Sequence, residues 1–415
     1  MFRVMIGSMF VLDALWWYLA DRRLRGLRHA RLWRTLVALL VFCMAAGLAM
    51  FIVWPEFMRR TNAFLPSLIN VAVFTWHLVI LPTGLLLAAL VGLAQLGTWL
   101  ISRYSRRRPP EEPYRPATPD DASDSADELP QPSLSRRRLL AAASVAIPPL
   151  LWGGGVTSAL FQIGHYRIRR IRVPLASLPP ELDGLTIAHV TDPHVGRFTD
   201  SAMLQGIARR VNELNPDLVL CTGDLIDYSL KDLDDAIAMT KAMTPRYGMA
   251  LCVGNHDLFQ GPEAFVARTR AAGLNMLVNQ WHTLKVRGVP IEIAGLNWAR
   301  GDEGLQVEMN RLMLNQTVAD RTRHGGFPIC LSHHPHGFDY AAEAGFALTL
   351  AGHTHGGQIM LTDHTGPADI VYRYISGLYR KNPAQALVVA NGVGNWFPLR
   401  VNAPSEICHL TLTRA

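Results

Sequence analysis

The sequence is poor in charged residues and in cysteine for a chain of its length. Only 18% of its 415 residues are charged, whereas 49% are hydrophobic. This balance is unusual for a soluble enzyme and predicts a membrane-embedded portion. The cysteines stand singly, without a Cys-x-x-Cys pair, at positions 43, 221, 252, 330 and 408. We interpret them as buried thiols. Because no two cysteines have the spacing of metal ligands, we do not expect a thiolate metal site.

Acidic residues are also too few to balance the basic ones, and the formal net charge is +7. A basic chain can bind nucleic acid, but here the arginines lie beside apolar segments, as is typical of membrane topology. We therefore expect a lipid bilayer as a partner and no nucleic acid. The length predicts at least two structural units.

Four apolar segments in the N-terminal third are candidate membrane spans. They cover residues 4–20, 35–54, 68–101 and 139–161, and the first of them contains Asp13 and the third His77. The third segment is too short for two spans, so we interpret it as one tilted or kinked helix. The predicted organisation is a transmembrane region at residues 1–101 with about three spans, and a fourth span at 139–161.

The segment between the third and fourth spans, residues 102–138, is rich in Pro, Asp, Ser and Glu, and we predict a disordered polar linker. Arginines are dense at residues 22–34 and 103–138, whereas the loop before the third span holds only Arg59 and Arg60. The positive-inside bias then predicts a multi-pass protein of the inner membrane with an extracytoplasmic C-terminal domain. The arginines at 167–172 oppose this orientation. Residues 135–140 resemble a twin-arginine export signal, and simple positive flanking of a helix explains them equally well.

From residue 168 onward, short apolar segments alternate with amphipathic ones. The expected strands are residues 185–190, 218–221, 249–253, 329–331 and 347–350, and the expected helices are 202–212, 233–243 and 263–271. This alternation predicts an α/β domain at residues 168–415, with helices on both faces of the sheet.

Each of the five expected strands is followed by side chains that can bind a metal ion. In chain order, the candidate ligands are Asp192 and His194, Asp224, Asn255, His333, and His353 with His355. Sites in α/β sheets gather at the carboxyl ends of the strands. A single Asp or His is usually a cap or a surface residue, but five successive groups predict one common site.

Imidazole, carboxylate and amide ligands together favour divalent ions such as Mn²⁺, Fe²⁺ or Zn²⁺. Seven ligands suffice for two ions that share one carboxylate. Two ions roughly 3.5–4 Å apart can bind a bridging hydroxide and clamp a phosphoryl group. His256, next to Asn255, can then protonate the leaving alkoxide as a general acid. The predicted reaction is hydrolysis of a phosphate ester.

The ordered series Asp-x-His, Gly-Asp, Gly-Asn-His-Asp, Ser-His and Gly-His-x-His resembles the calcineurin-like metallophosphoesterase superfamily over residues 185–412. The resemblance implies a four-layer α/β/β/α sandwich with a dinuclear centre between its sheets. It also implies two ligand groups bridged by Asp224: Asp192, His194 and His355 for one ion, and Asn255, His333 and His353 for the other.

The resemblance further implies that Asp257 orients the catalytic His256. Arg197 is a candidate phosphate contact by charge and position. In Ser-His-His-Pro, His334 is an alternative ligand, although the family register favours His333.

Within the superfamily the chain is similar to bacterial membrane-attached or twin-arginine-exported phosphodiesterases, through residues 352–359, 392–394 and 400–404. We expect a membrane-anchored phosphodiesterase that acts on a phosphate ester, with a lipid-linked or envelope-derived substrate as one possibility. One alternative is a pyrophosphatase acting on nucleotide-linked lipid precursors, which would need a cytoplasmic catalytic face. Another is a membrane sensor or scaffold with an inert domain.

Overall fold

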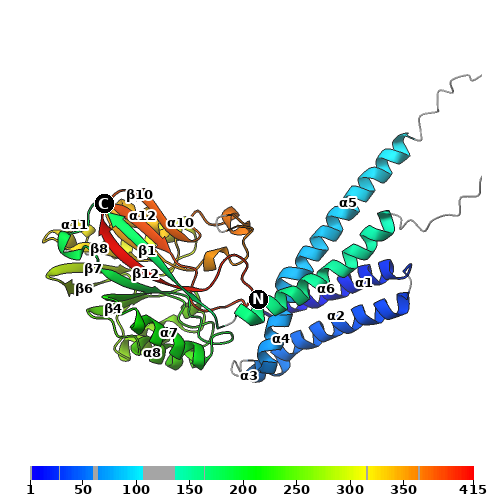
Figure 1. The fold of residues 1–415 in the computed structure, drawn as a ribbon, viewed down its shortest axis with the longest axis horizontal. Coiled ribbons are helices and arrows are strands. Elements are labelled where there is room, and N and C mark those ends of the chain that lie inside the picture. The colour runs from blue at the N-terminus through cyan, green and yellow to red at the C-terminus, as the bar shows by residue number, and fades with distance from the viewer. Residues whose placement is uncertain are drawn as a thin grey trace, which may run out of the picture. The chain divides into compact units, whose positions relative to one another are not determined.

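Figure 1 shows the computed structural model, which describes residues 2–27, 29–58, 64–105, 136–162, 164–314, 316–362 and 365–415. Most of the predicted linker, Arg59 and Arg60 lie outside the described residues. The chain divides into two compact units. One comprises Met1–Val53 and Ala72–Gly155, and the other comprises Trp54–Val71 and Val156–Ala415.

Helices cover all four segments that the sequence marks as apolar. Their bounds are α1 (Phe2–Leu24), α2 (Ala30–Val53), α3 (Pro55–Met58), α4 (Phe64–Thr75), the π-helical turn η1 (Trp76–Ile80), α5 (Leu81–Ser105) and α6 (Arg136–Gln162). Among the described residues, two helices are long and apolar enough to cross a membrane, Ala30–Val53 and the continuous helix Leu65–Tyr104. Only 22% and 17% of their most apolar windows are buried, so they are not the core helices of a soluble domain.

A buried polar cluster joins α1 to the π-helical turn η1. Asp13 is buried, and its Oδ1 accepts a hydrogen bond of 2.8 Å from Trp76 Nε1. Its Oδ2 lies 2.9 Å from His77 Nε2, and His77 Nδ1 lies 2.9 Å from the carbonyl oxygen of Val73. Both carboxylate oxygens therefore have partners, which offsets the cost of burying them among apolar helices.

The second unit contains two six-stranded sheets. The first has the order β1 (Arg167–Leu175), β12 (Glu406–Arg414), β2 (Thr186–Val190), β3 (Leu218–Thr222), β4 (Gly248–Cys252) and β5 (Met276–Leu277). The second has the order β10 (Gly377–Asn382), β11 (Gln385–Val389), β9 (Leu348–Ala351), β8 (Phe327–Leu331), β7 (Val289–Gly295) and β6 (Gln280–Val286). The five strands expected from the sequence are β2, β3, β4, β8 and β9.

The core between the sheets is built from one face of each sheet, and the other faces carry helices (Figure 1). In β3, Leu218 and Leu220 face the inter-sheet core, whereas Val219 and Cys221 pack among helical residues. This period of two explains why the strand is apolar throughout.

The outer layers are formed by two sets of helices. Residues of α7 (Ser201–Glu213), α8 (Leu233–Lys241) and α9 (Pro262–Ala271) pack on the first sheet, and those of α10 (Gly301–Met313), α11 (Val318–Thr322) and α12 (Gly337–Ala344) pack on the second. The four-layer α/β/β/α architecture is therefore confirmed. Because β2, β3 and β4 are mutually parallel, as are β7, β8 and β9, the carboxyl ends of the ligand-bearing strands in each sheet share one edge.

Candidate metal centre

The chain turns sharply where the ligand-bearing strands end. Asp192, His194, Asp224, His353 and His355 have φ angles of 53°, 44°, 52°, 72° and 49°. Residues other than glycine rarely adopt this left-handed region, which costs roughly 1–2 kcal/mol per residue. Such strain persists only where the surroundings impose it, and five of the seven candidate ligands adopt this conformation.

Two glycines let the backbone approach the carboxylates closely. A Cβ atom at Gly254 would overlap the Asp224 carboxylate, and one at Gly352 would overlap that of Asp192. Any larger residue would push these loops apart. This is the structural reason why Gly-Asn-His-Asp and Gly-His-x-His each begin with glycine.

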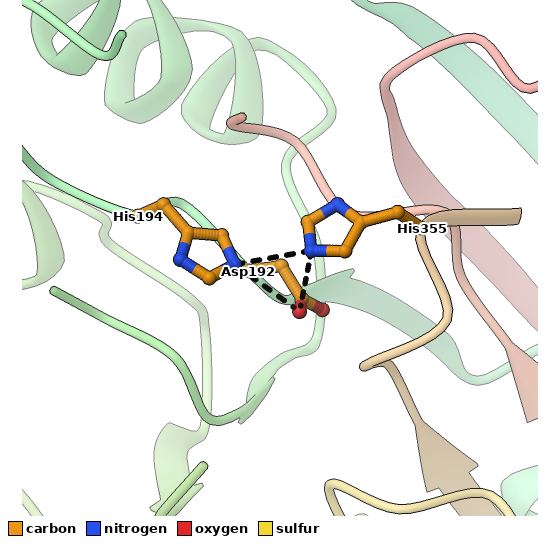
Figure 2. A group of neighbouring side chains, drawn as sticks. All are labelled: Asp192, His194 and His355. Carbon is orange, nitrogen blue, oxygen red and sulfur yellow. Dashed lines mark hydrogen bonds and ion pairs between the residues drawn. The ribbon is translucent and has the colours of Figure 1, made fainter. Parts of the chain in front are cut away.

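The first group of ligands comprises Asp192, His194 and His355, whose ligand atoms lie within 4.8 Å of one another (Figure 2). Asp192 Oδ1 lies 3.3 Å from His355 Nε2 and 3.6 Å from His194 Nε2. The other oxygen, Oδ2, accepts hydrogen bonds from Thr191 Oγ1 at 2.6 Å and from the His353 amide at 3.1 Å. The protein thus fixes one oxygen and directs the other at the two imidazoles.

The second group comprises Asp224, His333 and His353, also within 4.8 Å of one another. Asp224 Oδ1 accepts a hydrogen bond of 2.8 Å from the His256 amide. Its Oδ2 lies 3.2 Å from His333 Nε2 and 3.5 Å from His194 Nε2. A single carboxylate oxygen therefore faces one imidazole from each group.

Asn255 adds an amide oxygen. Its Oδ1 is buried and makes no hydrogen bond with any described residue. An unsatisfied buried acceptor costs about 1–3 kcal/mol, and a bound cation would remove that cost.

His333, and not His334, faces the carboxylates. His334 packs against Trp298, and its Nδ1 accepts a hydrogen bond of 3.2 Å from the His336 amide. Burial lowers the pKa of His334 to about 3, so its ring is neutral.

The protonation states suit cation binding. Burial favours the neutral form of Asp192, but His355 and His333 outweigh it and hold the Asp192 pKa well below its usual range. Burial also lowers the pKa of His355 to about 4 and that of His353 well below 6.5, so both rings are neutral. In His333 the Asp224 and Asp192 carboxylates overcome the effect of burial and raise the pKa to about 9. A divalent ion would replace that proton. The donors therefore fit two cations.

The expected partner of His256 requires a correction. The Asp257 carboxylate accepts hydrogen bonds from the backbone amides of Gly254, at 2.9 Å, and Ile226, at 3.2 Å, so it holds two loops together. The His256 ring instead contacts Asp227: Nδ1 bonds to the Asp227 carbonyl oxygen and lies 3.6 Å from Asp227 Oδ1. Burial opposes protonation of His256, but Asp227 and Asp224 raise its pKa to about 9.

Sequence reasoning also missed the role of Arg400 in the site. This buried guanidinium donates to Nδ1 of His355 at 2.8 Å and to the carbonyl oxygens of Gly394 and Asn391 at 2.7 and 2.8 Å. Because guanidinium can only donate, the His355 proton lies on Nε2, facing Asp192.

Aromatic side chains border the site. The Trp298 ring centroid lies 4.8 Å from that of His353, and the Trp396 centroid lies 6.3 Å from that of His256. The Tyr372 hydroxyl lies 3.2 Å from His353 Nε2. Arg197 lies half-buried in the loop between β2 and α7, and its role as a phosphate contact stays a prediction.

Comparisons with known proteins agree with this geometry. Residues 185–357 match the family model described as calcineurin-like phosphoesterase. A transmembrane protein with metallophosphoesterase domain from Danio rerio is 31% identical over 255 residues, which cover 59% of this chain and 57% of the relative. An uncharacterized metallophosphoesterase from Campylobacter jejuni is 32% identical over 249 residues, covering 59% of this chain and 63% of the relative.

A third relative is matched over nearly its whole length. The phosphodiesterase YaeI of Escherichia coli is 27% identical over 294 residues, which cover 67% of this chain and 99% of the relative. The chain thus spans about three fifths of the first two relatives and nearly all of the third.

Proposed function

We propose that the chain is a membrane-anchored, metal-dependent phosphodiesterase of the calcineurin-like phosphoesterase family, whose model matches residues 185–357. The observation that carries the proposal is the position of Asp224 Oδ2, within 3.5 Å of His194 in one ligand group and of His333 in the other. A shared carboxylate oxygen is the feature that a dinuclear centre requires and that an isolated single-metal site does not.

Two divalent ions, with Mn²⁺, Fe²⁺ or Zn²⁺ as the candidates, would supply an activated water and neutralise phosphate charge when bound. Asp192, His194 and His355 would hold one ion, and Asn255, His333 and His353 the other, with Asp224 between them. The chain's own residues hold Asp192 and Asp224 anionic and fix the orientation of both carboxylates.

His256 is the residue that would move a proton. Its Nδ1 is engaged by the Asp227 carbonyl oxygen, so Nε2 is the nitrogen left to protonate the leaving oxygen. The raised pKa keeps the ring protonated at neutral pH, as a general acid requires. Phe259 lies beside the His256 ring, with ring centroids 4.7 Å apart, and the His256 side chain is 17% exposed.

The membrane anchor gives the substrate a location. The two apolar helices support a site held near a bilayer, with a lipid-linked or envelope-derived phosphodiester as substrate. The arginine distribution supports an extracytoplasmic catalytic domain in the inner membrane. A reporter fused after Ala415 tests this orientation, because activity of a cytoplasmic reporter alone would reverse it.

The enzyme proposal is tested with the purified full chain in detergent. The metal-stripped chain and the same chain with added Mn²⁺ are assayed on bis-p-nitrophenyl phosphate and on p-nitrophenyl phosphate. We expect turnover that depends on metal, favours the diester and falls at least about 1,000-fold in Asp224→Asn, since the bridging ligand is lost. Asp234→Asn is the matched control, because that carboxylate is 80% exposed on α8. Equal activity in Asp224→Asn, or turnover without metal, would contradict the proposal.

A further inference from the structure

A basic hollow lies where α6 leads into the first sheet. It consists of two adjoining depressions of about 570 and 460 Å³, which share Tyr166, Arg210 and Glu213. The lining includes four arginines: Arg167, Arg170, Arg209 and Arg210. The metal centre uses none of these residues.

Two of the four arginines have no acidic partner among the described residues. Arg167 pairs with the buried Glu406 at 2.9 Å, and Arg210 pairs with Glu213 at 2.7 Å. The remaining acid of the lining, Asp200, caps α7 by accepting the Met203 amide.

Arg170 and Arg209 keep their charge uncompensated. Among the described residues, the Arg170 guanidinium has one hydrogen-bond partner, the His409 ring at 3.0 Å. Burial and Arg170 itself lower the pKa of that imidazole. Arg209 is exposed on α7. The lining thus holds two positive charges ready for an anion.

The hollow lies at the same edge of the sheet as the ligand loops. Arg167 is paired in register with Glu406 on β12, whose amide donates to the carbonyl oxygen of Gly392. Gly392 in turn packs against Asp192. Since β1 and β2 are separated by β12 alone, two strand spacings of about 4.8 Å place Arg167 about 10 Å from the end of β2.

The chain that enters this edge comes from an apolar helix. In α6, Leu150, Leu151 and Phe161 are 74%, 56% and 75% exposed, and exposed apolar side chains of this size favour contact with a membrane. Arg167 is six positions after Phe161, which limits the distance between their Cα atoms to about 20 Å even for an extended chain. The arginines therefore stay within reach of the headgroups of any bilayer that holds α6.

We propose that this hollow binds the phosphate headgroup of an anionic phospholipid, with Arg170 and Arg209 as the charged contacts. Guanidinium groups match phosphate oxygens with paired hydrogen bonds, and each basic side chain near an anionic surface strengthens binding severalfold. A bound headgroup would hold the ligand edge of the sheet against the membrane surface, and this role does not depend on which ester the metal centre hydrolyses.

The test is native mass spectrometry of the purified full chain, titrated separately with phosphatidylglycerol and with phosphatidylcholine. We expect Arg170→Gln/Arg209→Gln to weaken phosphatidylglycerol binding about tenfold at low salt and to leave phosphatidylcholine binding unchanged. Arg170→Lys/Arg209→Lys keeps both charges and should bind within about threefold of the unchanged chain. The matched control is Arg300→Gln/Arg323→Gln, which removes two exposed arginines beside α10 and α11.

Three results would overturn the proposal. Equal phosphatidylglycerol binding in the unchanged chain and the Gln pair would exclude the hollow as the site. An equal loss of phosphatidylglycerol binding in Arg300→Gln/Arg323→Gln would show that binding depends on the net charge of the chain and not on the hollow. Displacement of the lipid by millimolar inorganic phosphate would identify a free-phosphate site instead. A melting temperature measured for every variant separates lost binding from lost folding.

Discussion

Replacing Asp227 with asparagine tests how the structure controls the proton on His256. The substitution keeps the size of the side chain and leaves the backbone carbonyl that holds Nδ1 in place. It removes the negative charge that lies 3.6 Å from that nitrogen and 3.9 Å from His194 Nδ1. Because this charge favours the protonated ring, its removal lowers the pKa of His256.

The magnitude follows from the distance. Coulomb's law at 3.6 Å gives about 1.2 kcal/mol at the dielectric constant of water and about 4.6 kcal/mol at an effective value of 20. One pKa unit corresponds to about 1.36 kcal/mol, so these limits are about 0.9 and 3.4 units. Both side chains are partly exposed, at 17% and 13%, which favours the lower half of the range. We expect a shift of about 1–2 units.

The assay is the pH dependence of kcat/KM for bis-p-nitrophenyl phosphate. A general acid is active below its pKa, so the alkaline limb reports His256. In Asp227→Asn this limb should move to lower pH by about 1–2 units, whereas the rate at pH 6 changes little. Asp234→Asn should leave the limb in place. An alkaline limb that stays put in Asp227→Asn, or moves to higher pH, would refute the assigned pairing.

Three further predictions concern other parts of the chain. His333→Gln should abolish metal-dependent turnover and His334→Gln should keep it within about tenfold, since of these two histidines only His333 faces Asp224. The reverse order in the same assay would reassign the ligand. Arg400→Gln should weaken metal affinity about 10–100-fold in a chelator competition, because Arg400 orients the ligand His355. Unchanged affinity would mean that Arg400 has a purely structural role. Asp13→Ala leaves Trp76 Nε1 and His77 Nε2 without their partner in a buried position. The free energy of unfolding of the helical unit, measured by denaturation in detergent, should therefore fall by about 2–4 kcal/mol. No loss would show that the buried cluster is dispensable.

Part of the fold and of the site could be predicted because its signals are local. Five strands coincide with apolar segments of the sequence, and each is followed by a turn that contains His, Asp or Asn. These strands are β2, β3, β4, β8 and β9. The neighbouring pair β1 and β12 could not be predicted, because Arg167 and Glu406 meet only in the folded chain. Residues 167–172 stand out as basic, but their pairing as an edge strand depends on the far end of the sequence.

The residues that orient the ligands and His256 could not be predicted from the sequence either. Asp227 lies three residues after Asp224, and nothing in its sequence context distinguishes it from Asp257, which directly follows His256. The fold decides between them, since the backbone amides of Gly254 and Ile226 occupy the Asp257 carboxylate. Likewise, Arg400 reaches His355 only because the C-terminal loop folds back over the ligand edge.

The number of metal ions per chain decides whether Asp224 lies between two ions. The purified full chain, loaded with Mn²⁺ and freed of excess metal, is analysed by elemental mass spectrometry alongside Asp224→Asn. We expect two ions per chain and fewer than one in the variant, with activity that parallels full loading. One ion or none in a chain that turns over the diester at full rate would contradict a dinuclear centre bridged by Asp224.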